Sequence, residues 1–286
     1  MATRALVLGG GGVTGVAWEI GLLAGLVERG LELGSADLLV GTSAGAVVGA
    51  QLAWGTDLAR LYQKQLEPAA TGTAGRRGSG DTMRLRDMAV FGWATLRYQD
   101  PVRARARIGR MALGARTAPE ADRRAVIATV VPSEEWPGRR LLITAIDAVT
   151  GEFTAFHAGS GVSLVDAVGA SCAVPGVWPP VTMAGRRWID GGVRSPANAD
   201  LAAECERIVV LAPLPRGMRA ATAAARQAAE LTRAGHAVVV VSPDPPAVAA
   251  IGRNVLDPAR RAPAARAGHV QAAGPALDRV GTVWAG

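Results

Sequence analysis

The chain has 286 residues, of which 49% are hydrophobic, and a formal net charge of +7. This length and composition suffice for a sizeable core and exclude a disordered chain. No apolar run approaches the roughly 20 residues that span a bilayer, and an aromatic content of 4% disfavours a nucleic-acid binding protein that stacks bases.

The first predicted unit is a strand, a glycine loop and a helix. Residues 5–8 form a short apolar run that is typical of a buried parallel strand. Four glycines, Gly9 to Gly12, follow this strand, and the next apolar pattern predicts a helix over residues 15–29 with Gly30 as its stop. Only four apolar residues precede the glycines, so a signal-peptide core is not expected.

The glycine loop has two interpretations. The spacing of Gly10, Gly12 and Gly15 matches a dinucleotide fingerprint, which needs an acidic residue at the end of the second strand. That strand ends instead in Gly41, Thr42 and Ser43, so nucleotide binding is disfavoured. We expect an oxyanion hole, because glycines 10, 11 and 12 leave bare N–H groups that can approach a developing negative charge.

The second predicted unit carries the nucleophile candidate. An apolar strand over residues 38–40 leads into Gly41-Thr42-Ser43-Ala44-Gly45, and a small-residue helix follows over residues 46–53. Strand, tight turn and helix with a serine in the turn is the nucleophile elbow. Small residues at Gly41 and Gly45 are needed because side chains there would collide with neighbouring elements. Two such units within 55 residues favour an α/β parallel sheet.

Residues 56–135 form the least regular part of the sequence and are predicted to be a cap or insert. Residues 71–80 read as a loop, and a helix that opens at residues 117–120 is predicted to run to about Val131. Between them, arginines alternate with Met, Trp and Leu, which fits either an amphipathic cap meeting lipid or surface helices with solvated charges. These arginines are Arg84, Arg86, Arg97, Arg103, Arg105, Arg107 and Arg110.

The candidate base follows a later strand. Residues 140–147 predict a strand with a hairpin partner at 151–157, and a helix is expected over residues 163–172. A short strand then ends in Asp190, which Gly191 and Gly192 follow. An acidic residue at a strand end, without bulky neighbours after it, is a candidate partner for Ser43, although an ordinary Asp-Gly turn remains open.

The remaining chain continues the alternation of strands and helices. Strands are predicted over residues 206–213 and 236–243, and helices over 220–234 and part of 258–273. We see no linker and no repeat, so one domain over residues 1–286 is expected, with residues 205–286 completing the sheet. The two cysteines, Cys172 and Cys205, fit no metal or disulfide spacing, and neither a metal nor a cofactor is expected.

Taken together, these motifs resemble the patatin-like phospholipase family. Residues 10–15 resemble its glycine-rich oxyanion motif, residues 41–45 its nucleophile motif, and residues 190–192 its aspartate motif. Residues 170–181 resemble the segment before that aspartate, so the likeness covers about residues 5–200. One departure is Thr14, where the family commonly has Arg or Lys, and it weakens the expectation of a phospholipid substrate.

The resemblance implies a three-layer α/β/α fold with a mostly parallel sheet and a helical cap. It also implies a serine acyl hydrolase, a lipase or phospholipase A-type esterase, with a Ser43–Asp190 dyad and no histidine. Glycines 10, 11 and 12 would bind the oxyanion, and Thr14, Gly15, Gly41, Gly45, Gly191 and Gly192 would support the motifs. The expected partner is a lipid or acyl-ester substrate, and no nucleic acid is expected.

Three alternatives remain open. A Ser-Asp-His esterase would recruit His236 or His269, an acyltransferase would use the same dyad with another acceptor, and a lipid-binding protein would use the fold without catalysis. We expect a cytoplasmic protein, with transient association at a membrane surface through the basic cap. The oligomeric state, the head group and the acyl chain length are left open.

Overall fold

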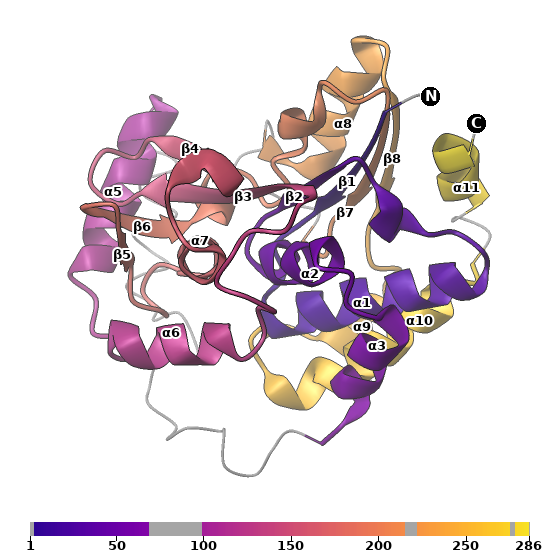
Figure 1. Cartoon of the computed structure of the whole chain (residues 1–286), viewed down its shortest axis with the longest axis horizontal. Helices are drawn as coiled ribbons and strands as arrows, with labels where there is room; N and C mark the ends of the chain where they lie inside the picture. Colours follow the sequence, from indigo (N-terminus) through magenta and orange to yellow (C-terminus); the bar gives the residue numbers. More distant parts are fainter. Residues whose placement is uncertain (1–2, 69–98, 215–221, 275–277, 286) are drawn as a thin grey trace.

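An eight-stranded sheet forms the centre of the molecule (Figure 1). The computed structural model describes residues 3–68, 99–214, 222–274 and 278–285. The strands are β1 (Arg4–Leu8), β2 (Leu38–Gly41), β3 (Arg140–Asp147), β4 (Phe153–Phe156), β5 (Val181–Met183), β6 (Arg186–Asp190), β7 (Arg207–Leu211) and β8 (Ala237–Val241).

Five strands are parallel and the other three are antiparallel additions. The pairs of β3 with β2, β2 with β1, β1 with β7, and β7 with β8 are all parallel. The strands β4 and β6 pair antiparallel with β3, and β5 pairs antiparallel with β6. The predicted mostly parallel sheet is therefore confirmed, and β7 and β8 extend it on the side of β1.

The register on β3 brings the end of β6 to the end of β2. Ile143 of β3 pairs with Gly41 of β2 and with Phe156 of β4, so β2 and β4 lie on opposite edges of β3. Ala145 pairs with Thr154 of β4 on one edge of β3 and with Asp190 of β6 on the other. Because β2 occupies the edge opposite β4, β6 and β2 lie along the same edge of β3. Asp190 thus lies just beyond Gly41, where the chain turns toward Ser43.

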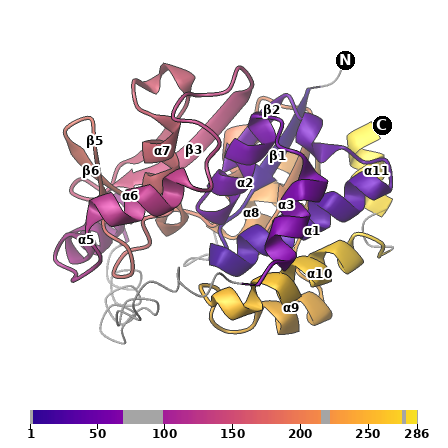
Figure 2. The ribbon, with the colours of Figure 1, turned by 60° about the horizontal axis from the view of Figure 1, so that its bottom comes forward.

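Helices cover both faces of the sheet (Figures 1 and 2). The side chains of β1 alternate: Leu6 and Leu8 join the cluster that contains residues of α1, α2, α7 and α10, whereas Ala5 and Val7 join the cluster with α8. The helices are α1 (Gly12–Glu28), α2 (Ala44–Ala53), α3 (Leu58–Leu66), α5 (Pro101–Leu113), α6 (Glu120–Ala128), α7 (Leu164–Ser171), α8 (Ala224–Arg233), α9 (Pro245–Ile251), α10 (Arg261–Gln271) and α11 (Asp278–Ala285).

Figure 2 shows α9 and α10 lying beside α1. Glycines allow this close approach, because a Cβ on Gly21 of α1 would lie 2.0 Å from the carbonyl oxygen of Ala265 in α10. The first helix begins at Gly12 rather than at the predicted Gly15, since Gly12 adopts a φ of 60° that lets the chain turn directly into the helix. The sequence did not predict α9 or α11.

The described part of residues 56–135 contains α3, α5 and α6, and it packs against the rest of the fold. Ile108 of α5 is buried with Ile146 and Ile189 of the sheet, and Arg105 Nε donates to the Gly151 carbonyl at 2.7 Å. Residues 69–98, which include Arg84, Arg86 and Arg97, lie outside the described residues. In the described part of the chain, each helix falls short of the length and apolarity that crossing a bilayer requires.

Candidate active site

Ser43 occupies a strained turn between β2 and α2. Its φ of 54° and ψ of −113° lie in a region that residues with a Cβ rarely adopt. The surrounding glycines are required by close backbone contacts: a Cβ on Gly41 would lie 2.6 Å from Ala46 Cα, and one on Gly45 would lie 2.1 Å from the Leu8 carbonyl oxygen. The turn is thereby packed tightly against β1 and the start of α2.

The residues at the end of α7 hold both Ser43 and Asp190. The Ser43 N–H donates to Ser171 Oγ at 2.9 Å, and the Cys172 thiol donates to the Ser43 carbonyl oxygen at 3.2 Å. The N–H of Asp190 donates to the carbonyl oxygen of Ala173 at 3.1 Å. Three consecutive residues therefore fix the backbone of the serine and of the aspartate relative to each other.

Asp190 is buried at the end of β6 and its carboxyl group contacts Ser43. Its exposed fraction is 5%, and burial raises its pKa to about 6, because the ionised form loses hydration. Hydrogen bonds from the Gly192 N–H, at 2.7 Å to Oδ1, and from the Ser43 side chain offset part of this rise in pKa. A carboxylate with a pKa near 6 is a better base than a solvated one.

The two positions after Asp190 require glycine because neighbouring atoms lie too close for a side chain. A Cβ on Gly191 would lie 2.2 Å from Thr144 Oγ1 of β3. A Cβ on Gly192 would lie 2.9 Å from Asp190 Oδ1, the oxygen that its own N–H binds. Larger residues at either position would displace the carboxyl group from Ser43.

The glycine loop lies beside the serine, and its three glycines differ in their contacts. Gly10 Cα lies close to the elbow, since a Cβ there would be 3.5 Å from Ser43 Cβ, but the Gly10 N–H donates to the Pro196 carbonyl at 2.7 Å. Within the described residues, the N–H groups of Gly11 and Gly12 have no hydrogen-bond acceptor. These two N–H groups, at the start of α1, are thus available to an anion.

Thr14 and Gly15 support this loop from within α1. Thr14 is fully buried, and both its N–H and its hydroxyl bind the carbonyl oxygen of Val255, at 3.1 and 3.2 Å. Gly15 approaches Ala44, where an added Cβ would lie 3.4 Å from the Ala44 Cβ. Thr14 therefore anchors the loop to Val255 through hydrogen bonds and supplies no charge.

The three histidines bind elsewhere in the fold. His236 precedes β8 at the amino ends of the parallel strands, opposite the carboxyl ends where Ser43 lies, and its Nδ1 is 2.9 Å from the Cys205 carbonyl. His269 pairs with Glu28 at the far end of α1, at 3.0 Å. His157 caps a short turn through its contact with the Gly159 N–H. The structure therefore does not bring a histidine to Ser43.

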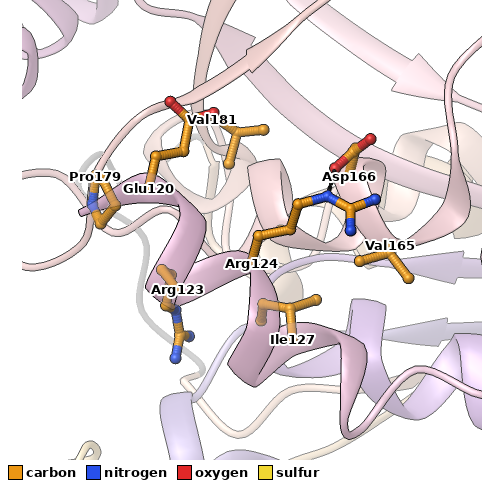
Figure 3. Close-up of a pocket in the computed structure, with 9 residues that line it drawn as sticks. Glu120, Arg123, Arg124, Ile127, Val165, Asp166, Pro179 and Val181 are labelled. Carbon is orange, nitrogen blue, oxygen red and sulfur yellow. Dashed lines mark hydrogen bonds and ion pairs between the residues drawn. The ribbon is translucent and has the colours of Figure 1, made fainter. Parts of the chain in front are cut away.

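A small surface pocket lies between α6 and α7, and it contains none of the predicted site residues (Figure 3). Arg124 on its wall pairs with Asp166 at 2.7 Å and with Glu134 at 2.8 Å, so its charge is already neutralised. Arg123 stacks over the Trp178 ring at 4.0 Å. Among the residues the structure describes, no three His, Cys, Asp or Glu side chains gather as a metal site would need.

Sequence reasoning missed several residues that position the site. Ser171 and Cys172 lie in the segment whose family resemblance was noted, but nothing in their spacing showed that they would bind Ser43. Thr144 meets Thr42 because β3 pairs with β2, whereas Asn198 reaches Thr42 from the segment that follows β6. A single sequence carries no signal for either contact.

Comparison with known proteins places the chain in a family. A family model described as patatin-like phospholipase matches residues 6–203, more than half of the chain. The chain belongs to the patatin-like phospholipase family. The resemblance that the glycine loop, elbow and aspartate motifs indicated is therefore confirmed.

Individual relatives of this patatin-like chain are distant. Lysophospholipase NTE1 of Phaeosphaeria nodorum is 39% identical over 74 residues, which are 26% of this chain and 4% of that protein. VipD from Legionella pneumophila is 16% identical, with a TM-score of 0.50, over 99% of this chain and 67% of its own. The type III effector ExoU is 19% identical, with a TM-score of 0.41, and the match covers 97% of this chain and 53% of the ExoU chain. The similarity to VipD supports the patatin-like fold alone.

Proposed function

We propose that this chain is a serine acyl hydrolase that cleaves fatty-acyl esters of lipids through a Ser43–Asp190 dyad. The contact between the Ser43 side chain and the buried Asp190 carboxyl group supports this proposal most directly. The N–H groups of Gly11 and Gly12, which have no acceptor among the described residues, lie at the same carboxyl end of the parallel strands as Ser43. The family assignment supports a lipid as the source of the ester.

Acylation begins when Ser43 Oγ attacks the ester carbonyl carbon. Asp190 takes the hydroxyl proton, and the carbonyl π-electrons move to the oxygen, which becomes an oxyanion. The N–H groups of Gly11 and Gly12 bind that oxyanion. When the oxyanion collapses, the bond to the alcohol oxygen breaks, the alcohol leaves with the proton from Asp190, and an acyl-serine remains.

Deacylation repeats these steps with water as the nucleophile. Asp190 deprotonates the water as it attacks the acyl carbon, and the Ser43 oxygen leaves with the returned proton. The products are a fatty acid and the free enzyme. The two backbone bonds that hold Ser43 in its strained turn keep Oγ in place through both steps.

Phospholipids and lysophospholipids are the substrates to test first. The named activity of the Phaeosphaeria nodorum relative is that of a lysophospholipase, although the match covers a small part of that protein. Thr14 offers no positive charge for a phosphate, so we expect binding to depend more on the acyl chain than on the head group. Association with a lipid surface through basic residues between 56 and 135 is part of this proposal.

The test combines covalent labelling with hydrolysis. A fluorophosphonate probe should label the wild-type protein at Ser43, as located by peptide mass spectrometry, and Ser43→Ala should lose both labelling and ester hydrolysis. Ser35→Ala, an exposed serine that binds only the Glu32 carbonyl, is the matched control. A fully active Ser43→Ala or Asp190→Asn enzyme would refute the dyad.

A screen of esters then separates hydrolysis from transfer. The wild-type protein should release fatty acid from esters of graded chain length and from phospholipid vesicles. High-yield transfer of the acyl group to an added alcohol would favour an acyltransferase. Vesicle binding by the wild-type protein without acyl release or labelling would favour a lipid-binding protein.

A further inference from the structure

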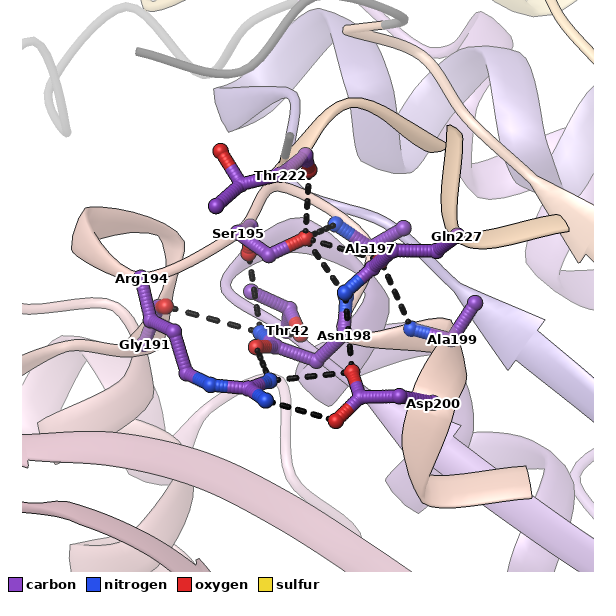
Figure 4. Close-up of polar contacts among 10 residues, drawn as sticks. All are labelled: Thr42, Gly191, Arg194, Ser195, Ala197, Asn198, Ala199, Asp200, Thr222 and Gln227. Carbon is purple, nitrogen blue, oxygen red and sulfur yellow. Dashed lines mark hydrogen bonds and ion pairs between the residues drawn. The ribbon is translucent and has the colours of Figure 1, made fainter. Parts of the chain in front are cut away.

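The segment between β6 and β7 contacts all three parts of the candidate site. Figure 4 shows its contacts with Thr42 of the elbow and Gly191 after the base. It follows Asp190 directly and includes Pro196 and Asn198. Its backbone binds the glycine loop, since the Pro196 carbonyl accepts the 2.7 Å hydrogen bond from Gly10. The elbow and the aspartate loop are reached by the side chain of one residue, Asn198.

The Asn198 side-chain amide joins the residue before the nucleophile to the residue after the base. Its Nδ2 lies 3.0 Å from Thr42 Oγ1 and 3.5 Å from the Gly191 carbonyl oxygen, and it donates to the Ser195 carbonyl at 2.8 Å. Asn198 and Thr42 are both fully buried. A buried amide that loses these acceptors is costly, so the contacts hold the two loops at a fixed separation.

The backbone of Asn198 is itself constrained. Its φ of 53° is left-handed, a conformation that asparagine tolerates better than other residues with a side chain. The Asn198 N–H donates to Ser195 Oγ at 3.0 Å, which stabilises this turn. The position therefore needs both an unusual backbone and an amide donor.

A second group of side chains orients the Asn198 amide. Arg194 Nη1 donates to Asn198 Oδ1 at 2.7 Å, which leaves Nδ2 facing Thr42. Arg194 also forms two hydrogen bonds with the Asp200 carboxylate, at 3.0 and 2.6 Å. Gln227 of α8 holds Asp200 at 2.8 Å and lies 3.0 Å from Ser195 Oγ. Gln227, Asp200 and Arg194 therefore form a chain of hydrogen bonds that fixes the orientation of the Asn198 amide.

We propose that Asn198 is a positioning residue that couples the Ser43 elbow to the Asp190 loop through Thr42. This inference rests on the proposed function. The physical reason is that proton transfer from Ser43 requires the two side chains within hydrogen-bond reach, and a displacement of about 1 Å can cost about 10²-fold in rate. The side-chain amide of Asn198 donates to Thr42, Gly191 and Ser195, and not to the Ser43 hydroxyl or the Asp190 carboxyl group.

The experiment compares side-chain removal with backbone change. Asn198→Gly keeps the left-handed backbone and removes the amide, whereas Asn198→Asp keeps the shape and replaces the donor by an oxygen. We expect kcat and the rate of fluorophosphonate labelling to fall by about 10- to 100-fold in both variants. KM should stay within about twofold, because no substrate contact is lost. Gln51→Ala, which removes a buried amide bound to the Val130 carbonyl at the far end of α2, is the control and should keep kcat.

A double-mutant cycle with Thr42→Val tests the route of the effect. The single variant Thr42→Val should have a reduced kcat. If Asn198 acts through Thr42, the fold-loss in kcat of the double variant with Asn198→Gly should be smaller than the product of the two single fold-losses. Wild-type kcat in Asn198→Gly, or independent effects in the cycle, would overturn the inference while leaving the proposed function intact. A wild-type protein that neither hydrolyses esters nor reacts with the probe would overturn the proposed function itself, and the inference with it.

Discussion

The backbone N–H of Gly10 donates a hydrogen bond of 2.7 Å to the carbonyl oxygen of Pro196. This bond fastens the glycine loop to the segment that follows Asp190. It also occupies one of the three N–H groups that the sequence suggested for the oxyanion. The N–H groups of Gly11 and Gly12 are therefore the donors on which we expect catalysis to depend.

Gly12→Ala should abolish most of the activity. Gly12 has a φ of 60°, and an added Cβ would lie 2.7 Å from the Val255 carbonyl oxygen, so the loop must shift. Loss of one oxyanion donor costs about 10²- to 10³-fold in kcat. Steady-state hydrolysis of a soluble ester measures this loss.

Gly30→Ala is the matched control for that variant. Gly30 also has a positive φ, of 78°, but a Cβ there would meet no atom of the described residues within 4 Å, and it lies at the other end of α1. It should lose stability through backbone strain and keep kcat. Equal activity of both glycine variants would contradict the assignment of Gly12 to the oxyanion hole.

Activity should rise with pH through about 6. Asp190 must be ionised to accept the Ser43 proton, and burial raises its pKa from 3.8 to about 6. We expect kcat/KM to increase across this pH range and to level off at neutral pH. A profile of kcat/KM from pH 4 to 9 measures it, and a rate that is constant from pH 4 to 7 would exclude Asp190 as the base.

Asp190→Asn should make the protein more stable while removing activity. A carboxyl group with a raised pKa in the folded state favours folding when protonated, and this contribution is lost as the pH rises through about 6. The ionised form therefore destabilises the fold at pH 7, by at most about 3 kcal/mol. Thermal unfolding at pH 7 should give a higher Tm for Asp190→Asn, and a lower Tm would contradict this reasoning.

The histidines should be dispensable for turnover. The double variant His236→Ala/His269→Ala removes one residue at the amino ends of the strands and one paired with Glu28, both distant from the elbow. We expect kcat within about twofold of the wild type, although stability can fall because His269 also stacks on Tyr62 at 4.8 Å. A loss of kcat comparable to that of Ser43→Ala would instead support the alternative of a Ser-Asp-His esterase.

The strands, the glycine loop and the elbow could be predicted because their signals are local. The apolar run before Gly9, the small residues around Ser43 and the strand ending in Asp190 each lie within a few neighbouring positions. The resemblance then connected them across the chain. Their approach in space depends on β6 pairing with β3 at Ala145, a register that no local pattern specifies.

The parts that were missed depend on long-range packing. The helices α9 and α11 have only seven and eight residues, which is too short for an apolar pattern to identify them, and α9 packs on α10 while α11 packs on β7 and β8. Asn198 lies in a stretch whose sequence is typical of an ordinary loop. Its proposed positioning role depends on its contact with Thr42, 156 positions earlier in the chain. The burial of Glu19 could not be predicted from the sequence either, because a glutamate in an amphipathic helix is usually exposed.

Cys172 should be chemically inert in the folded protein. Burial raises the pKa of its thiol to about 12, and the thiol donates to the Ser43 carbonyl oxygen. Maleimide at pH 8 should therefore label Cys172 only after denaturation, since the thiolate is the reactive form. Peptide mass spectrometry distinguishes it from Cys205, and rapid labelling of the native protein at Cys172 would contradict the buried site.

Glu19→Gln should stabilise the protein, and more so at high pH. Glu19 of α1 is fully buried, and neither carboxyl oxygen has a hydrogen-bond partner among the described residues. Burial raises the pKa of this carboxyl group well above 4.5, and a weaker interaction with the backbone of Gly9 offsets part of the rise. The stabilising contribution of the protonated form is complete below the pKa of the unfolded chain and is lost as the pH rises through the folded pKa.

Urea unfolding at pH 5, 7 and 9 tests this expectation for Glu19. Glutamine stays neutral, so the gain in free energy of unfolding for Glu19→Gln should grow from pH 5 to pH 9. The titration of Asp190 is present in both proteins and cancels in the difference. Glu67→Gln, an exposed glutamate at the end of α3, should show no such growth. A gain that is constant with pH would mean that Glu19 is ionised in the folded protein, and would place an unseen partner beside it under the glycine loop.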